Sequence, residues 1–194
     1  RSSQAPLHLR YTDATLGAQA LSAESWVSVG GFTGYDEAWI PTLIVRRQAA
    51  SAPLASTFVG VFEPYCERPR VRGLRRLSLR DERGRPYADA NVALEIALEG
   101  GESDLLISAD VENPLHVLPT ASEGGVLAQD EWNVQMSGDL CWLHRDAQGR
   151  IRRAICCGAR SLSIQGMALK LGDGAGCQEI TWEQGRVVVA PIGG

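Results

Sequence analysis

The chain has 194 residues, of which 44% are hydrophobic and 22% charged, and its formal net charge is −4 at pH 7. A folded chain of this size buries roughly 70% of the surface that its unfolded form exposes, so a sizeable core is expected. The interspersed acids and bases exclude a nucleic-acid binder that works through a broad basic face, and no apolar stretch approaches the roughly 20 residues of a membrane-spanning helix.

Strand patterns follow one another along the chain, and no helical period is sustained over a dozen residues. Each strand pattern is apolar in alternation or rich in β-branched residues, and is bounded by turn residues. The predicted strands lie within Ser25–Phe32, Ala38–Arg47, Ser56–Tyr65, Val71–Arg80, Asn91–Gly100, Ser103–Glu112, Asp139–Asp146, Arg150–Gly158, Ser161–Leu171, Glu179–Gly185 and Arg186–Ile192. So many short strands at this spacing predict an all-β fold, an antiparallel β-sandwich of layered sheets with little or no helix.

Two hairpins are the most specific local predictions. Cys141–His144 is expected to pair with Arg150–Cys156 around the turn Asp146–Gly149. Ile180–Val189 is expected to fold back on itself around Glu183–Gly185. These contacts are local, so the sheet can be built from sequential neighbours.

The longest segment without strand character is Ala109–Glu131, which is expected to be a loop or covering segment inside the domain. No linker, repeat or low-complexity tract divides the chain, so residues 1–194 are predicted to form a single β-sandwich domain. The chain opens on RSSQAPLHLRY, without an initiator methionine or a signal sequence. It is therefore expected to be a segment of a larger protein.

The five cysteines leave at least one thiol outside any intrachain disulfide. Their spacing contains no CxxC and does not predict a disulfide framework, and most of them are expected to be small buried hydrophobic residues. The neighbouring Cys156 and Cys157 would point to opposite faces of a strand, which argues against joint metal ligation. Which cysteines are free thiols is left open.

The three histidines, His8, His116 and His144, are expected to be surface or turn residues rather than catalytic ones. No HxH, HxxH or HExxH spacing occurs, so we predict no metal site, and we predict no cofactor. Carboxylates could still converge in space as an acid and base pair. The candidates for such a pair are Glu63, Asp110, Glu112, Asp130 and Glu131.

The densest basic stretch carries arginines at even positions, which on an unbroken strand would share one face. These arginines are Arg68, Arg70, Arg72, Arg76 and Arg80. The row is either a solvated strand face or a site for an acidic polymer, because guanidinium groups bind carboxylates through paired hydrogen bonds. Arg68, Arg70 and Arg72 are the residues of this stretch that we predict to bind substrate.

Aromatic rings offer a second route to a glycan, since sugars dock their C–H faces on large flat side chains. Trp26 and Tyr35 flank a glycine-containing loop and are the predicted exposed candidates for substrate binding, with core packing as the alternative. Trp142 and Trp182 lie inside strand patterns and are expected in the core.

The run TFVGVFEPY, Thr57–Tyr65, resembles the FVxVxEPY run found downstream of the catalytic region in heparinase II/III-like polysaccharide lyases, the group that includes oligoalginate lyases. The order of the following segments is also similar to the C-terminal β-sheet region of that family, and the resemblance covers about Trp39–Leu171. It implies a parent enzyme with an α/α toroid followed by layered antiparallel sheets, which cleaves uronate polysaccharides by β-elimination. It also implies a periplasmic or secreted location, with an acidic polysaccharide and the toroid domain as partners.

In that family the catalytic tyrosine, histidine and asparagine or arginine groups lie in the toroid and in the first part of the sheet region. None of them falls on a matching motif position here, so the resemblance implies no catalytic residue in this chain, and Tyr65 is not assigned as one. The chain departs from the family pattern at Cys66 and Glu67, where a small basic or glycine-containing turn is usual. The resemblance thus implies a scaffold and cleft wall without a complete catalytic set. A carbohydrate-binding module, an assembly domain and a free-standing hydrolase are the alternatives.

The same run also has a purely physical interpretation. Its apolar face is expected in the core, Pro64 is expected to end the ladder, and Tyr65 is expected to cover the corner with its hydroxyl reaching the backbone. Glu63 is expected either to cap the turn or to pair with an arginine such as Arg68 or Arg70.

Overall fold

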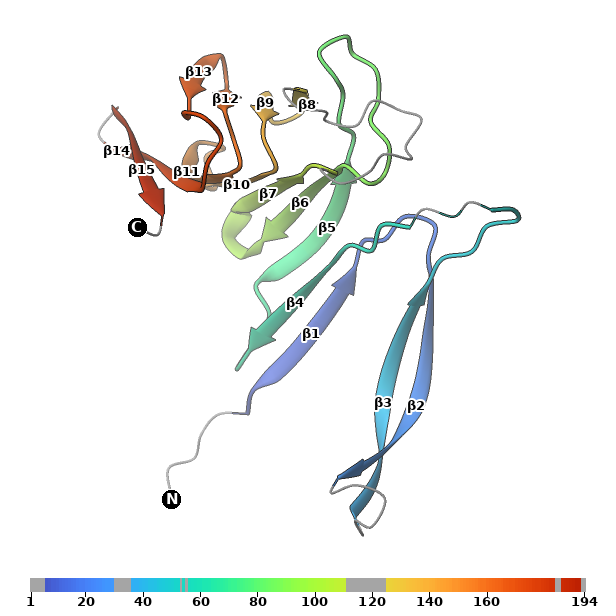
Figure 1. Ribbon diagram of the computed structural model, residues 1–194. Helices are drawn as coiled ribbons and strands as arrows, with labels where there is room; N and C mark the ends of the chain where they lie inside the picture. Colours follow the sequence, from blue (N-terminus) through green and yellow to red (C-terminus); the bar gives the residue numbers. More distant parts are fainter. Residues whose placement is uncertain are drawn as a thin grey trace. The chain divides into compact units, whose positions relative to one another are not determined.

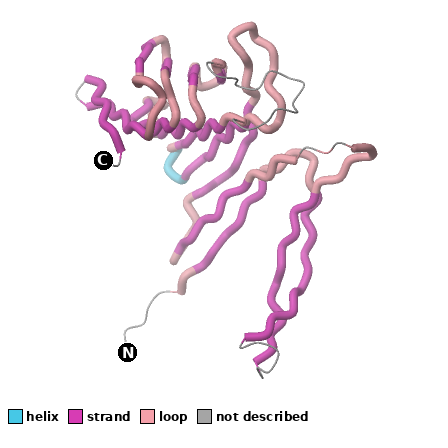
Figure 2. The backbone as a smooth tube through the Cα atoms, viewed as in Figure 1, coloured by secondary structure: helices cyan, strands magenta, loops and turns pink. Residues whose placement is uncertain are grey.

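The computed structural model describes residues 6–29, 36–52, 54, 56–110, 125–183 and 186–192. These residues form an all-β structure of antiparallel sheets, as predicted, with one short 3-10 turn, η1 (Glu99–Gly101) (Figures 1 and 2). They fall into two compact units, one formed by Arg1–Ala14 with Val59–Gly194 and the other by Thr15–Phe58. The single domain expected over residues 1–194 stays a prediction.

The larger unit is built around a seven-stranded antiparallel sheet with the order β15-β14-β11-β10-β7-β6-β5. Its strands are β5 (Val71–Leu77), β6 (Val92–Leu98), β7 (Ser103–Ser108), β10 (Leu140–Arg145), β11 (Ile151–Cys157), β14 (Cys177–Glu183) and β15 (Arg186–Ile192). Both predicted hairpins are confirmed, because β10 pairs with β11 and β14 pairs with β15.

A second sheet of four strands has the order β13-β12-β9-β8. Its strands are β8 (Leu127–Gln129), β9 (Val134–Ser137), β12 (Ser161–Ile164) and β13 (Met167–Lys170). Strand β8 falls in the stretch predicted as a loop, because three residues are too few to show an alternating pattern. The sequence pattern also merged β12 and β13 into one strand, since only two residues, Gln165 and Gly166, separate them.

The hydrophobic core lies between these two sheets. In β7 and β10, buried residues alternate with partly exposed ones, so one face of the large sheet is apolar and covered. The core residues of the large sheet include Ala93, Leu105, Ile107, Cys141, Leu143, Ala154, Cys156 and Ile180. Those of the small sheet are Leu127, Val134, Met136, Leu162 and Ile164.

The second part of the run TFVGVFEPY forms β4 (Gly60–Tyr65), but the setting of this strand differs from the prediction. Strand β4 pairs with β1 (His8–Asp13), which the sequence pattern did not predict, in a separate two-stranded sheet. The ladder continues through Pro64, which a strand without a second ladder partner tolerates, so Pro64 does not end it. Phe62 is 68% exposed, so the phenylalanine face of the run does not lie in the core.

Glu63 connects this small sheet to the seven-stranded sheet. Its Oε1 accepts hydrogen bonds from the backbone N–H groups of Arg70 and Val71, and its Oε2 pairs with Arg10 at 2.7 Å. Arg10 also donates to the carbonyl of Val71. The expectation that Glu63 caps backbone groups is confirmed, whereas the arginine that it pairs with is Arg10 and not Arg68 or Arg70.

Replacing Glu63 by glutamine is expected to lower the free energy of unfolding by about 2 kcal/mol, because the ionised acceptor is lost from three hydrogen bonds. Desolvation opposes ionisation, but the N–H groups of Val71 and Arg70 and the charge of Arg10 outweigh it and hold the pKa of Glu63 below its ordinary value. The contribution is therefore complete above the ordinary pKa of 4.5 and is lost as the pH falls through the lowered pKa.

Urea unfolding of the native chain and of E63Q from about pH 7 to about pH 2 measures this difference. The two stability curves should converge at acid pH. A gap that stays constant over the whole range would contradict the assignment.

The smaller unit is a hairpin of β2 (Gln19–Val29) and β3 (Asp36–Arg46). Exposed apolar residues lie on both of its faces, with Trp26 opposite Trp39 on one and Leu21 opposite Ile44 on the other. A two-stranded hairpin is at best marginally stable by itself in water, so this unit gains little stability from burial within the hairpin.

Candidate functional site

The structure places each of the three predicted substrate-binding arginines beside a carboxylate. Arg68 and Arg72 pair with Glu99 at 3.3 and 2.8 Å, and Arg70 pairs with Glu102 at 3.2 Å. The side chains of these three arginines are exposed, and ion pairs on the surface contribute little to stability. Glu99 and Glu102, at the turn between β6 and β7, offset two of these three positive charges, which favours a solvated surface over an acidic-polymer site.

The predicted row of arginines on one strand face does not form. Strand β5 begins at Val71, so Arg68 and Arg70 precede it. A register shift between Val71 and Gly73 also interrupts the alternation around Arg72. Even spacing in the sequence could reveal neither the strand start nor the bulge.

The predicted aromatic residues have different settings. Trp26 is 47% exposed on the β2–β3 hairpin, as expected of a surface aromatic, while Tyr35 lies outside the described residues. Trp182 packs against the edge of the core. Trp142 is partly buried and alternates with the core residues Cys141 and Leu143, so its expected place in the core is wrong.

The face of the seven-stranded sheet that points away from the core carries a group of side chains that the sequence did not reveal. Strand pairing places Asp104 of β7 opposite His144 of β10, and His144 opposite Arg153 of β11. The next row contains Trp142 of β10 and Glu179 of β14, which both pair with β11. We name these five residues the outer-face cluster.

His144 is held in one orientation by two neighbours. Its Nδ1 lies 2.8 Å from Asp104 Oδ1, and its ring stacks on Trp142 with centroids 6.1 Å apart and an interplanar angle of 19°. An ionised carboxylate only accepts hydrogen bonds, so Nδ1 carries the hydrogen in this contact. The neutral ring then presents Nε2 as an acceptor.

Arg153 lies beside the same indole. Its Cζ is 5.9 Å from the centroid of the Trp142 ring, and its Nε pairs with Glu179 at 2.5 Å. In the part of the chain that the structure describes, its two terminal nitrogens contact no acceptor. An aromatic ring, an oriented imidazole and a guanidinium group therefore share one surface.

The sequence could not bring these groups together, because Asp104 and His144 are 40 residues apart and meet only through the pairing of β7 with β10. Two local signals pointed to part of the cluster. The alternation of β10 places Trp142 and His144 on one face, and the register of the predicted hairpin places Arg153 opposite His144.

Three of the five carboxylates considered for an acid and base pair are bound to an arginine. Glu63 pairs with Arg10, Asp130 with Arg80 and Glu131 with Arg75. Asp110 takes part in none of these three ion pairs. The candidate carboxylate Glu112 lies outside the described residues, as does the histidine His116. Within the described ranges, no group of three His, Cys, Asp or Glu side chains could hold a metal ion.

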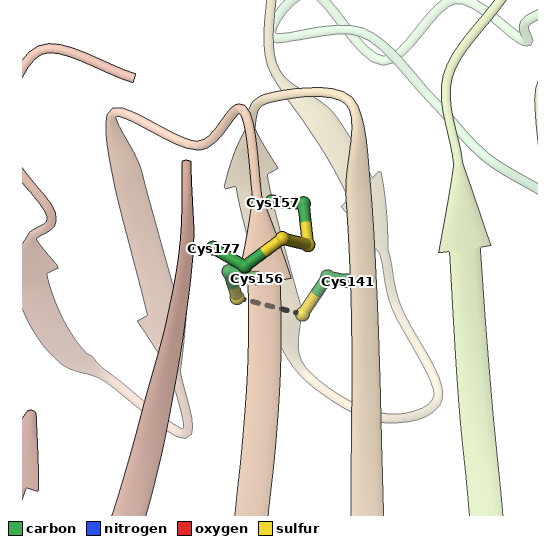
Figure 3. The surroundings of a disulfide bond; sticks show 4 residues. All are labelled: Cys141, Cys156, Cys157 and Cys177. Atoms are coloured by element: carbon green, nitrogen blue, oxygen red, sulfur yellow. Dashed lines mark hydrogen bonds between the residues drawn. A yellow bond between two sulfur atoms is a disulfide. The ribbon is translucent and has the colours of Figure 1, made fainter. Parts of the chain in front are cut away.

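The cysteines form one disulfide rather than a framework. Cys157 of β11 and Cys177 of β14 are bonded to each other, while Cys141 and Cys156 face the core with their sulfur atoms 3.1 Å apart (Figure 3). The hydrogen bond with Cys156 and the burial of the pair raise the pKa of Cys141 well above its ordinary value. The expectation that most of the five cysteines are buried hydrophobic residues is wrong, because only Cys141 and Cys156 are buried, while Cys66 is an exposed thiol.

No protein-family model matches this chain, and a search of curated proteins finds no match. The resemblance to heparinase II/III-like lyases therefore stays a prediction from the sequence. Across the described residues, no helix has the length and apolar character needed to span a membrane.

Proposed function

We propose that this chain is the C-terminal β-sandwich portion of a polysaccharide lyase that acts on uronate-containing glycans by β-elimination. The chain contributes scaffold and one wall of the polysaccharide cleft, and it does not hold a complete catalytic set. The resemblance of TFVGVFEPY to the family run supports this proposal. The disulfide is in keeping with a periplasmic or secreted location, because disulfides persist in oxidising compartments.

The outer-face cluster is the observation that carries the glycan contact. The Trp142 indole offers a flat apolar surface to the C–H face of a sugar ring, and the terminal nitrogens of Arg153 can bind a uronate carboxylate. His144 Nε2 can accept a hydrogen bond from a sugar hydroxyl. The cluster thus offers one group to each part of a uronate unit.

The same groups suit an auxiliary part in β-elimination. A guanidinium group beside the uronate carboxylate stabilises the charge that develops when the C5 proton is removed. A base that accepts the C5 proton and an acid that protonates the leaving oxygen are also needed, and in this proposal both groups come from outside this chain. The isolated chain is therefore expected to bind glycan without cleaving it.

Calorimetric titration with alginate, heparin and chondroitin, alongside the ultraviolet absorbance of the unsaturated product, tests the proposal. We expect binding without new absorbance, and a loss of affinity of roughly tenfold in Arg153→Gln, because a charge-assisted hydrogen bond is removed. Arg83→Gln, at an exposed turn residue outside the cluster, is the matched control and should bind as the native chain does. New absorbance would refute the proposal that this chain lacks a complete catalytic set. Absence of binding would refute the proposal that the chain contacts glycan.

An assembly domain is the second candidate, and a specific observation favours it. Leu9 and Phe62 are exposed on the β1–β4 sheet, and Trp39 and Leu43 are exposed on the β2–β3 hairpin. Exposed apolar surface of this kind is typical of packing against another chain. This candidate predicts that Phe62→Ser changes the association state in sedimentation velocity and that the native chain binds no glycan.

A further inference from the structure

A pocket of about 500 Å³ opens where the two sheets of the sandwich end, away from the outer-face cluster. Its walls include Arg150 and Arg152 of the β10–β11 hairpin, Trp182 of β14, and Gln165 and Met167 at the β12–β13 turn. Its volume is within the range of about 300 to 1,000 Å³ found for ligand pockets. Nothing in the proposed function uses this pocket.

The pocket has an excess of positive charge. Arg150 Nε and Arg152 Nε both contact Asp146 Oδ2, at 3.0 and 2.7 Å, so two guanidinium groups share one carboxylate. Desolvation opposes ionisation of Asp146, but hydrogen bonds from the Arg150 backbone and from both guanidinium groups hold its pKa well below the ordinary value. Among the described residues, no acceptor contacts the terminal nitrogens of Arg152, which leaves them for an anionic ligand.

A β-bulge directs Arg152 into the pocket. The register passes from His144 opposite Arg153 to Arg145 opposite Ile151, so Arg152 is the extra residue of β11. Regular alternation would place Ile151 and Arg152 on opposite faces, yet both line this pocket. Bulges commonly redirect a side chain in this way beside binding sites.

The turn at the rim of the pocket departs from the usual turn residues. Gln165 and Gly166 both have left-handed backbone, with φ of 51° and 85°. Asn-Gly is the favoured pair for a two-residue hairpin turn of this kind, and glutamine adopts the left-handed region less readily than asparagine. The longer amide of Gln165 lines the pocket, so the residue that disfavours the turn is one that a ligand would contact.

We propose that this pocket binds a single carboxylate-bearing sugar unit of the glycan. Trp182 and Met167 contact the apolar face of the ring, Arg152 and Arg150 bind the carboxylate, and Gln165 binds a hydroxyl group. The inference deepens the proposed function, because it rests on a uronate glycan as the ligand class, but it assigns a second and separate site.

The neighbouring residues Arg152 and Arg153 provide a matched pair of variants. Each change to glutamine removes one positive charge from β11, and the two side chains lie in different sites. The probe is glucuronate, and glucose is its neutral counterpart. Two-dimensional ¹H–¹⁵N NMR spectra of the whole chain detect the binding of each sugar. Glucuronate should shift the indole N–H signal of Trp182 and the amide signal of Gly166, whereas glucose should not.

Arg152→Gln should weaken the binding of glucuronate at this pocket roughly tenfold, while Arg83→Gln, which lies in neither site, should leave it unchanged. If Arg153→Gln weakens glucuronate binding and Arg152→Gln does not, the proposal that the pocket binds a uronate is wrong, and the proposed function stands. Equal binding of glucuronate and glucose, or no binding at the pocket while alginate still binds the chain, would likewise overturn the pocket. If alginate does not bind either, the proposed function fails as well.

Gln165→Asn is a second variant that keeps the turn. Asparagine favours the left-handed position, so the variant should be at least as stable as the native chain in urea unfolding. Its shorter amide should nevertheless weaken glucuronate binding severalfold. Unchanged binding in both Gln165→Asn and Arg152→Gln would exclude the pocket as a uronate site.

Discussion

The Leu143→Ala variant is expected to lose about 3 kcal/mol of unfolding free energy, because a buried leucine is replaced by a cavity. Leu143 is 0% exposed in the middle of β10, and it lies between Leu105 of β7 and Ala154 of β11 on the core face of the sheet. The four-stranded sheet covers this face, so collapse of the structure around the missing methyl groups is restricted.

Leu140→Ala is the matched control, since Leu140 is a partly exposed residue of the same strand on the other face. Leu140→Ala should lower the free energy of unfolding by less than about half as much as Leu143→Ala. Urea unfolding measures both changes, with the same dependence of the free energy on urea concentration applied to both variants. Equal losses would show that the outer face is as deeply buried as the core. That result would contradict the proposal that the outer face binds a ligand.

Replacing Cys157 and Cys177 by serine is expected to destabilise the chain by about 3 kcal/mol, because the disulfide closes a loop across 20 residues and restricts the unfolded chain. The two residues pair directly on β11 and β14, so the bond fits the sheet register. Thermal unfolding of the oxidised native chain and of the double variant measures the difference.

The Cys66→Ser variant should unfold as the native chain does, because Cys66 is an exposed thiol. A reducing agent should lower the melting temperature of the native chain toward that of the double variant and should leave the double variant unchanged. A reductant effect of similar size in both proteins would assign the stabilisation to some other pair of cysteines.

Local chemistry made much of the fold predictable. The β10–β11 hairpin follows from the turn at Asp146, whose side chain accepts hydrogen bonds from the backbone N–H groups of Gln148 and Arg150. The alternation of Leu105 and Ile107 in β7 likewise predicts a strand with one buried face. In each case residues close in the chain determine the structure.

Pairings between distant segments set the limit of that prediction. Arg10 and Glu63 are 53 residues apart, and nothing in the run around Phe62 indicates that it pairs with an N-terminal strand and stays exposed. The outer-face cluster has the same origin, because Asp104 meets His144 only across the β7–β10 ladder. The prediction that the arginines share one strand face was wrong for a local reason. A bulge between Val71 and Gly73 interrupts an alternation that is regular in the sequence.

Titration of alginate into the native chain, Arg153→Gln and Arg83→Gln measures whether the outer-face cluster contacts a uronate glycan. We expect the native chain and Arg83→Gln to bind alginate with the same affinity, and Arg153→Gln to bind it roughly tenfold more weakly. Equal affinities for all three proteins, or no binding by the native chain, would contradict the proposal that this cluster contacts glycan.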